Sequence, residues 1–332
     1  MDTNEPLLSA NEYITFTGIA HDDLEESCIA QEKSRWTSEE IVFDDDTSNW
    51  SKLDTNTKLF ITHVLSFSVV SDGLVNANLL SRFTQEVTDP SCRRFYLFQA
   101  YMEDVHARTY GKMLTSVIMD RNELQRLLHP NLHIQSIAHK IKWIEKWINS
   151  DSPFGQRVIA FAIIEGIFFS SLFCAFFWLK QRGAKLPGMI QANELISKDE
   201  ASHCEFNIKL LKYVKFRLSR EEIFEMMDEA VEIEKYFIEE AIPVDLVQIN
   251  RDTMLSYVKF IANRWLESIP CKEGFAGPLY NNVDMPLKWM ETISIPLFAS
   301  FFEVIPVEYE DSKLCTSSAD KSFTTDLTIF ED

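Results

Sequence analysis

After residue 54, apolar residues recur at helical spacing along most of the chain. Residues three and four apart share one face of a helix, so this periodicity predicts a series of amphipathic helices. Asp54 or Thr55, and Ser219 with two glutamates soon after it, are typical helix caps. No stretch alternates convincingly as a strand would, so the pattern predicts an all-α protein. The helices are expected over residues 55–82, 91–118, 134–149, 153–183, 188–217, 219–241, 245–266 and 287–302.

Residues 158–179 form a nearly unbroken apolar run, VIAFAIIEGIFFSSLFCAFFWL. By length alone this run could span a bilayer. Glu165 lies within it, and a carboxylate in such surroundings is costly unless it is paired or binds a metal. No second comparable run stands out, and the flanking helices are amphipathic. We therefore expect the central helix of a soluble bundle and no membrane.

Composition narrows the class of protein. The chain has 332 residues, only 9 glycines and 25 phenylalanines, which favours a helical protein with a large core. Its net charge of −19 argues against binding to nucleic acid or to an anionic membrane surface. The acidity fits plain solubility, a basic partner protein, or carboxylates gathered as metal ligands. Six dispersed cysteines without a C-x-x-C pair, and an N-terminus without a secretory pattern, favour a cytoplasmic location.

Three segments differ in character. Residues 1–30 are polar and irregular, residues 31–303 carry the helical patterns, and residues 304–332 are polar with isolated hydrophobic positions. The last segment cannot build a core alone. It suits a tail that becomes ordered on a partner, although a frayed terminus has the same composition.

Two Glu-x-x-His motifs carry the candidate chemistry: Glu103 with His106, and Glu200 with His203. Residues three apart share a helix face, so each pair can point at one site. Mixed oxygen and nitrogen ligands suit iron or manganese. One such motif is weak evidence because it arises often by chance, whereas two within largely apolar helices are considerably stronger.

Two further carboxylates lie among apolar neighbours, Asp72 in LSFSVVSDGLVNANLL and Glu165 in the long run. A dinuclear site in a helical bundle takes one such carboxylate from each of two additional helices. Four carboxylates would balance two divalent ions, and without metal they would repel one another or bind protons. Each residue alone could be an ordinary buried polar group, but the six together predict a dinuclear metal site.

The segments SDGLVNANL, MEDVHARTY, AIIEGIFFSSLF and NELISKDEASHC resemble the small subunit of class I ribonucleotide reductase. The similarity extends from EPLLSANEY near the N-terminus, through RWTSEE, to the tail, and thus covers nearly the whole chain. It implies a ferritin-like helical bundle, usually a homodimer, with a dinuclear iron site in each subunit. Two iron ions rather than manganese are implied, oxo-bridged and diferric in the active state. The residues that match the iron ligands are Asp72, Glu103, His106, Glu165, Glu200 and His203.

Tyr110 matches the tyrosine that becomes a stable radical in this family. Its spacing also makes sense by itself, because Glu103, His106 and Tyr110 lie at i, i+3 and i+7 on one helical face. An ordinary core tyrosine would fit the same position. The family resemblance further implies that an apolar group shields the radical; its members here are Phe169, Phe173 and Ile196, which are equally suited to plain core packing.

The resemblance also implies a path for the radical. Trp36 matches the tryptophan that relays an electron to the metals, and Asp199 matches the carboxylate between that tryptophan and His106. Tyr309 matches the tail tyrosine that passes the radical to the large subunit, on which the tail docks. Two features depart from the family pattern: Lys198 replaces an arginine that many relatives carry, and the chain continues to Asp332 after Phe330. The docking residues among Phe323, Leu327 and Phe330 therefore stay open.

These expectations combine into one hypothesis: the chain is the radical-generating subunit of a ribonucleoside-diphosphate reductase. The chain has no phosphate-binding loop and no paired redox cysteines, so nucleotide reduction would need a separate large subunit. The alternatives are a ferritin-like oxidase or iron-storage protein, a homologue that binds the large subunit without making radicals, and a membrane-bound diiron enzyme.

Overall fold

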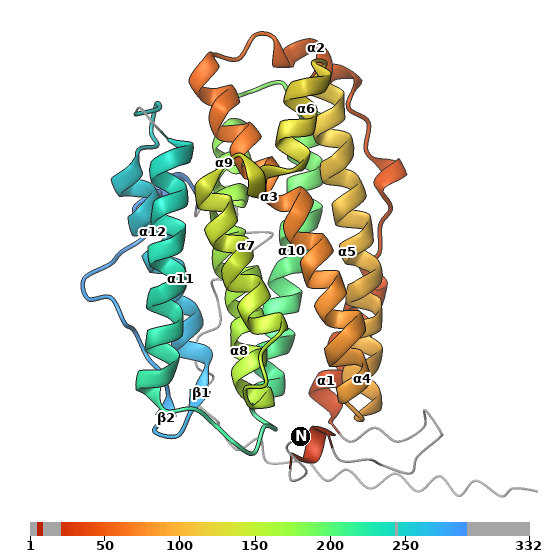
Figure 1. Cartoon of the computed structure of the whole chain (residues 1–332), viewed down its shortest axis with the longest axis vertical. Helices are drawn as coiled ribbons and strands as arrows, with labels where there is room; N and C mark the ends of the chain where they lie inside the picture. The colour runs from red at the N-terminus through yellow and green to blue at the C-terminus, as the bar shows by residue number, and fades with distance from the viewer. Residues whose placement is uncertain (1–4, 9–20, 243–244, 291–332) are drawn as a thin grey trace, which may run out of the picture.

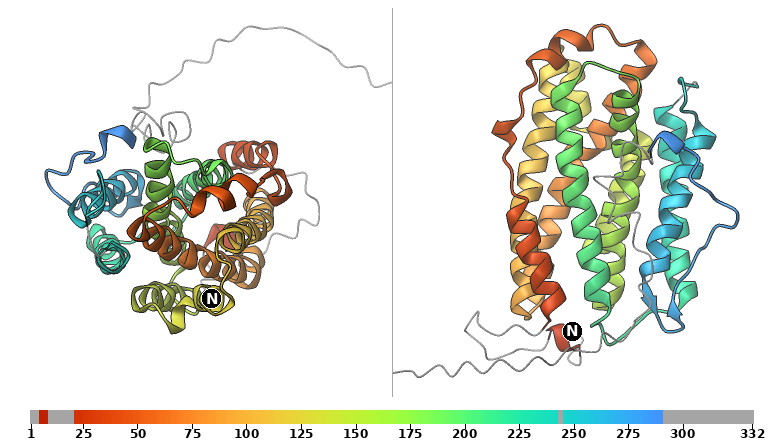
Figure 2. Two further views of the ribbon diagram at one scale, coloured as in Figure 1. Left: turned by 90° about the horizontal axis from the view of Figure 1, so that it is seen from above. Right: turned by 180° about the vertical axis from the view of Figure 1, so that it is seen from behind.

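The computed structural model describes residues 5–8, 21–242 and 245–290. Long helices run side by side along the long axis of the molecule (Figure 1), and Figure 2 shows the bundle down that axis and from behind. The expected all-α architecture is confirmed for the described residues. The α-helices are α1 (Asp22–Lys33), α2 (Asp44–Trp50), α3 (Thr55–Asn78), α4 (Thr84–Glu86), α5 (Pro90–Val117), α6 (Arg121–Leu128), α7 (Gln135–Ile148), α8 (Phe154–Ile163), α9 (Ser170–Gln181), α10 (Pro187–Leu211), α11 (Arg220–Ala241) and α12 (Arg251–Ser268).

Shorter elements complete the fold. Two π-helical segments interrupt the long helices, η3 (Leu79–Phe83) after α3 and η5 (Ile164–Phe168) between α8 and α9. Sequence periodicity does not reveal them, because a single inserted residue leaves a continuous apolar run looking helical. The remaining elements are the 3-10 turns η1 (Pro6–Leu8), η2 (Ser38–Glu40) and η4 (Pro130–Leu132), and a small hairpin of β1 (Pro270–Cys271) and β2 (Gly274–Phe275).

Several helix boundaries follow from local chemistry. The Asp54 carboxylate accepts a hydrogen bond from the Thr57 backbone N–H at the start of α3, and Ser219 forms a capping box with Glu222 at the start of α11. Gly183 adopts a φ of 69° just after α9, as a terminating glycine does.

The expectation that residues 1–30 are irregular is wrong from Asp22 onward, where α1 begins with three acidic residues in its first turn. Two expected helices are wrong in extent. α12 begins at Arg251 rather than at residue 245, because Leu246 and Ile249 form a tight turn and Asn250 caps the helix instead. α10 ends at Leu211, six residues before the expected end at Arg217. The expected helix over 287–302 lies largely outside the described residues.

Four long segments form the centre of the bundle: α3, α5, α10 and the continuous segment made of α8, η5 and α9. α3 packs against α5 and α9, and α10 packs against α5, α8 and α9. α11 and α12 pair with each other on one side, beside α7 and η5. The site described below lies where the central segments face one another.

The helix Phe154–Gln181 has the length and apolarity to cross a membrane, and its most apolar window is entirely buried in the bundle. This burial agrees with the expected core helix. A second helix, Thr55–Glu86, also passes the test of length and composition, so the expectation of a single such run was wrong. The most apolar window of that helix is two-thirds buried.

Candidate metal centre

Six acidic and histidine side chains from four segments converge inside the bundle. α3 contributes Asp72, η5 contributes Glu165, and α5 and α10 each contribute a Glu-x-x-His pair. Every one of them is at most 2% exposed. The structure therefore brings together all six residues that the sequence singled out, namely Asp72, Glu103, His106, Glu165, Glu200 and His203.

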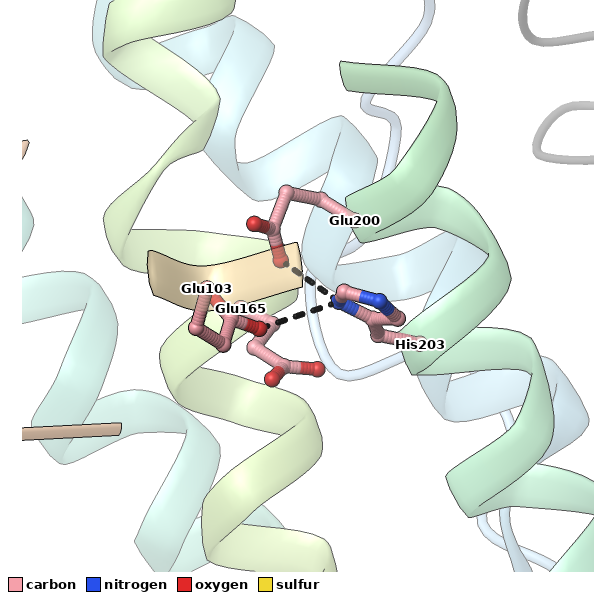
Figure 3. A group of neighbouring side chains, drawn as sticks. All are labelled: Glu103, Glu165, Glu200 and His203. Carbon is pink, nitrogen blue, oxygen red and sulfur yellow. Dashed lines mark hydrogen bonds and ion pairs between the residues drawn. The ribbon is translucent and has the colours of Figure 1, made fainter. Parts of the chain in front are cut away.

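The six residues fall into two overlapping groups. Ligand atoms of Glu103, Glu165, Glu200 and His203 lie within 4.8 Å of one another. Figure 3 shows these four side chains turned toward one another. Ligand atoms of Asp72, Glu103 and His106 form a second group and also lie within 4.8 Å of one another. Glu103 belongs to both groups, so two ions could be held side by side with this carboxylate between them.

The two glutamates of the Glu-x-x-His motifs each face both histidines. Glu103 places Oε2 3.5 Å from His106 Nδ1 and Oε1 3.2 Å from His203 Nδ1. Glu200 places Oε1 3.0 Å from His106 Nδ1 and Oε2 3.3 Å from His203 Nδ1. Each carboxylate thus offers one oxygen to either side. Glu103 and Glu200 could therefore each contribute an oxygen to both of two neighbouring cations.

Asp72 and Glu165, the two carboxylates outside the Glu-x-x-His motifs, have buried oxygens without a hydrogen-bond partner among the described residues. Both oxygens of Asp72 and Oε2 of Glu165 are buried and accept no hydrogen bond from any described residue. Burying a carboxylate without a partner is strongly unfavourable, whereas a bound cation would satisfy it. Four carboxylates and two imidazoles also form the ligand set of dinuclear iron and manganese sites. The residues present therefore fit two such ions.

Burial and mutual contact shift the pKa values in this cluster. Burial, together with the neighbouring charge of Glu103, raises the pKa of Asp72 well above its usual range, and burial does the same to Glu165. Burial also acts to raise the pKa of Glu103, but its contacts with the two histidines outweigh this and lower the value to about 2. Burial acts to lower the pKa of both histidines, and their contacts with the carboxylates outweigh it and raise the pKa well above the usual value. Without metal, protons would take the place of the cations.

Hydrogen bonds connect the His106 imidazole, the Asp199 carboxylate and the Trp36 indole. His106 Nε2 lies 3.1 Å from Asp199 Oδ2, and the indole N–H of Trp36 donates to the same oxygen at 2.8 Å. The rings of Trp36 and His106 are stacked with centroids 5.8 Å apart. With Nε2–H directed at Asp199, Nδ1 is left facing Glu103 and Glu200, which is the orientation of a metal-binding histidine. Lys198, beside Asp199 in sequence, is exposed.

Tyr110 is buried on α5, one turn beyond His106, and its hydroxyl has no hydrogen-bond partner among the described residues. Burial raises the pKa of Tyr110 well above its usual value, and the negative charges of Asp72, Glu200 and Glu103 add to the shift. The phenol is therefore neutral, and it lies close enough to the carboxylates to interact electrostatically with them. Phe169, Phe173 and Ile196 are also buried, and the Phe169 and Phe173 rings stack at 6.0 Å.

Gln99 belongs to the cluster and was missed from the sequence. Its amide nitrogen donates to Glu165 Oε1 at 2.6 Å and lies 3.3 Å from Glu103 Oε1. The signal was available, because Gln99 precedes Glu103 by four residues and therefore shares its helix face. Tyr309, Phe323, Leu327 and Phe330 lie outside the described residues.

Comparison with known proteins places this protein among reductase subunits. The family model for the ribonucleotide reductase small chain matches residues 13–282. One ribonucleoside-diphosphate reductase small chain of Arabidopsis thaliana is 38% identical over 332 residues, covering 95% of that protein and 100% of this one. The small chain of Trypanosoma brucei brucei is 40% identical, covering 92% of its own length and 95% of this chain.

Solved structures agree on the fold. The ribonucleotide reductase Rnr4 homodimer from Saccharomyces cerevisiae superposes with a TM-score of 0.77 at 28% identity, covering 93% of its own length and 90% of this chain. The ribonucleotide reductase R2 subunit from Clostridium botulinum gives a TM-score of 0.76 at 21% identity, covering 91% of its own length and 85% of this chain.

Proposed function

The chain belongs to the ribonucleotide reductase small-chain family, and from this premise we propose that it generates and exports a tyrosyl radical for ribonucleoside-diphosphate reduction. As a small chain it is an oxidoreductase subunit with the ferritin-like fold, and it works with a large subunit. The observation that carries the proposal is the pair of carboxylates, Glu103 and Glu200, that each face both histidines beside a buried Tyr110.

Six side chains would hold two iron ions. Asp72 and His106 would serve one position, Glu165 and His203 the other, and Glu103 and Glu200 would lie between them. When bound, the ions supply the oxidising power, drawn from O2, that a phenol needs to lose an electron. Gln99 would hold Glu165 in place through its amide hydrogen bond.

Tyr110 is the residue that we propose loses one electron and its phenolic proton. Its neutral state before oxidation is supported by the raised pKa. Its burial, at 1% exposure, supports a long-lived radical, because water and reductants cannot reach the ring. Phe169, Phe173 and Ile196 would contribute to this exclusion through their packing.

The hydrogen bonds at Asp199 support a relay role for His106, Asp199 and Trp36. Asp199 orients His106 through Nε2 and orients the Trp36 indole through its N–H, so one carboxylate couples the two rings. In this proposal the oxidising equivalent passes along these residues and on through Tyr309 to the large subunit. The docking segment would be the tail 304–332.

A homodimer in the cytoplasm is the proposed state of the protein. The solved relative from Saccharomyces cerevisiae is itself described as a homodimer. The most apolar stretch of the helix Phe154–Gln181 is entirely buried in the bundle, which supports a protein that stays in the aqueous phase.

The proposal is tested by loading purified protein with Fe(II) under argon and admitting O2. A tyrosyl signal should appear in electron paramagnetic resonance, with close to two irons bound per subunit. Tyr110→Phe should bind the same iron and lose the signal. An unchanged signal in this variant would assign the radical elsewhere, and an absence of iron binding by the wild type would refute the metal centre itself.

A further inference from the structure

A buried ion pair lies next to the π-helical turn that carries Glu165. Lys140 of α7 and Glu234 of α11 are both 0% exposed, and Lys140 Nζ lies 2.5 Å from Glu234 Oε2. Ser171 of α9 donates its hydroxyl to the other carboxylate oxygen, Oε1, at 2.5 Å. A fully buried ion pair is costly to desolvate, and well-packed apolar residues often stabilise a fold equally well. A role in fixing local geometry therefore accounts for this pair better than a role in stability.

The ammonium group also contacts the backbone of the π-helical turn. Lys140 Nζ donates to the carbonyl oxygen of Phe168, the last residue of η5, at 3.0 Å. The Ser170 hydroxyl donates to the preceding carbonyl, that of Ile167, at 2.6 Å. A π-helical turn departs from the regular hydrogen-bond ladder, so its buried carbonyls can accept from side-chain partners as well as from the backbone, as the Ile167 carbonyl does from the Phe169 N–H. Side chains supply these partners at two consecutive carbonyls where η5 ends.

Aromatic rings enclose the ammonium group on its remaining sides. Nζ lies 3.7 Å from the ring centroid of Phe237, 4.2 Å from that of Phe67 and 5.4 Å from that of Phe168. Such contacts are favourable for a cation and leave it no space to move. The position of Lys140 Nζ is thus fixed by a carboxylate, a carbonyl and three rings.

The turn is also closely packed at Gly166. Gly166 follows Glu165, and a Cβ added at this glycine would lie 2.6 Å from Nε1 of Trp265 in α12. The turn therefore packs directly against the indole, while Lys140 binds its last carbonyl. Contacts from α7, α11 and α12 together fix the backbone that carries Glu165.

We propose that Lys140, Glu234 and Ser171 form a positioning cluster that holds the π-helical turn in the register that aims Glu165 at the metal centre. The inference rests on the proposed function, since it assigns Glu165 to that centre. None of the three residues would touch a metal ion or the radical. They would act through the backbone of residues 164–168, on the side away from the ligands.

The test compares the wild type with the double variant Lys140→Met/Glu234→Met, which removes both charges and leaves neither one unpaired. Amide hydrogen exchange is measured on the metal-free protein, and Fe(II) binding is titrated anaerobically. We expect residues 164–169 to exchange faster while the rest of the bundle does not. We also expect one of the two irons to bind about 10- to 100-fold more weakly, as when a supporting residue of a metal ligand is lost.

Lys146 and Glu229 provide a matched control, because they form an ion pair between the same two helices at 2.9 Å but are about half exposed. Lys146→Gln/Glu229→Gln should leave both exchange and iron binding unchanged. If the buried double variant behaves like this control, the cluster is packing only and the proposal is overturned.

Ser171→Ala keeps the test decisive if the double variant does not fold, because it removes a single hydrogen bond. Faster exchange confined to residues 164–169 would support the proposal, and wild-type exchange there would overturn it. The exchange readout needs no metal. A wild type that fails to bind two irons would therefore refute the proposed function without deciding the positioning role.

Discussion

Replacing Gly166 by alanine tests how tightly the turn carrying Glu165 is packed. The new methyl group would lie 2.6 Å from Trp265 Nε1 and 3.1 Å from both Cδ1 and Cε2 of that indole. Unstrained contacts of this kind lie at about 3.5–4.0 Å, so the ring or the turn must move by roughly an ångström. Trp265 is only 6% exposed, so it has little room to yield. Overpacking of a core typically destabilises by about 1–3 kcal/mol.

The chain offers two internal controls for this substitution. Gly73 follows Asp72 and Gly111 follows Tyr110, just as Gly166 follows Glu165, yet an added Cβ at either control position meets nothing within 4 Å. Alanine is favoured over glycine within helices by about 1 kcal/mol. Gly73→Ala and Gly111→Ala should therefore be neutral or stabilising. Gly166→Ala should be less stable than either control by about 1–3 kcal/mol, and roughly 0–2 kcal/mol less stable than the wild type.

Urea denaturation of the metal-free proteins at one fixed subunit concentration measures these differences, since association and metal binding both shift apparent stability. Iron binding should weaken in Gly166→Ala and stay normal in Gly111→Ala. The packing argument is refuted if Gly166→Ala is as stable as the two control variants.

Three further outcomes are expected. Trp36→Phe removes the indole hydrogen bond to Asp199, so reductase activity with the large subunit should fall about 10- to 100-fold while iron content stays at the wild-type level; equal activity would remove Trp36 from the relay. Deleting residues 323–332 should abolish that activity and leave the radical signal intact, and a fully active truncated protein would disprove tail docking. Burial acts to raise the pKa of Glu86, but the neighbouring Arg157 and Arg82 outweigh burial and lower this pKa. The lowered pKa stabilises the folded protein fully above the pKa of Glu86 in the unfolded chain, about 4.3. This stabilisation is lost as the pH falls through the pKa of Glu86 in the folded protein. The stability advantage of the wild type over Glu86→Gln, followed by urea denaturation from pH 7 to pH 3, should therefore shrink on acidification, and a constant difference would contradict the argument.

The convergence of the six candidate ligands could be predicted from the sequence because the pattern that reveals them is local. The i, i+3 spacing of Glu103 and His106 fixes their shared face whatever the tertiary structure. Glu165 stood out because nothing in its apolar surroundings could satisfy a carboxylate. The overlap of the two groups at Glu103, in contrast, depends on how α3, α5, η5 and α10 pack together, so spacing along the sequence could not predict it.

Lys140 and Glu234 were overlooked because each lies in a helix rich in charges, where a single charge is normally solvated. Their positions nevertheless follow the apolar stripe: Lys140 lies three residues after Ile137 and four before Ile144, all buried. Glu234 lies in the same way between Val231 and Ile238. Charges of opposite sign on the buried stripes of two helices are a detectable signal. Their pairing, however, depends on the packing of α7 against α11.

The acidic cluster can exist with or without metal because its charges can be balanced in two ways. In the metal-free protein, the raised pKa values of Asp72 and Glu165 favour neutral carboxyl groups, and those of His106 and His203 favour cations that face Glu103 and Glu200. With two divalent ions, the four carboxylates would balance the metal charge and the histidines would bind as neutral ligands. Both states would be close to neutral inside an apolar bundle, so we expect the protein to fold before it acquires metal. If Lys140, Glu234 and Ser171 hold Glu165 as proposed, the backbone at Glu165 would keep one position while bound protons are exchanged for metal ions. Metal uptake should then depend on the turn between α8 and α9.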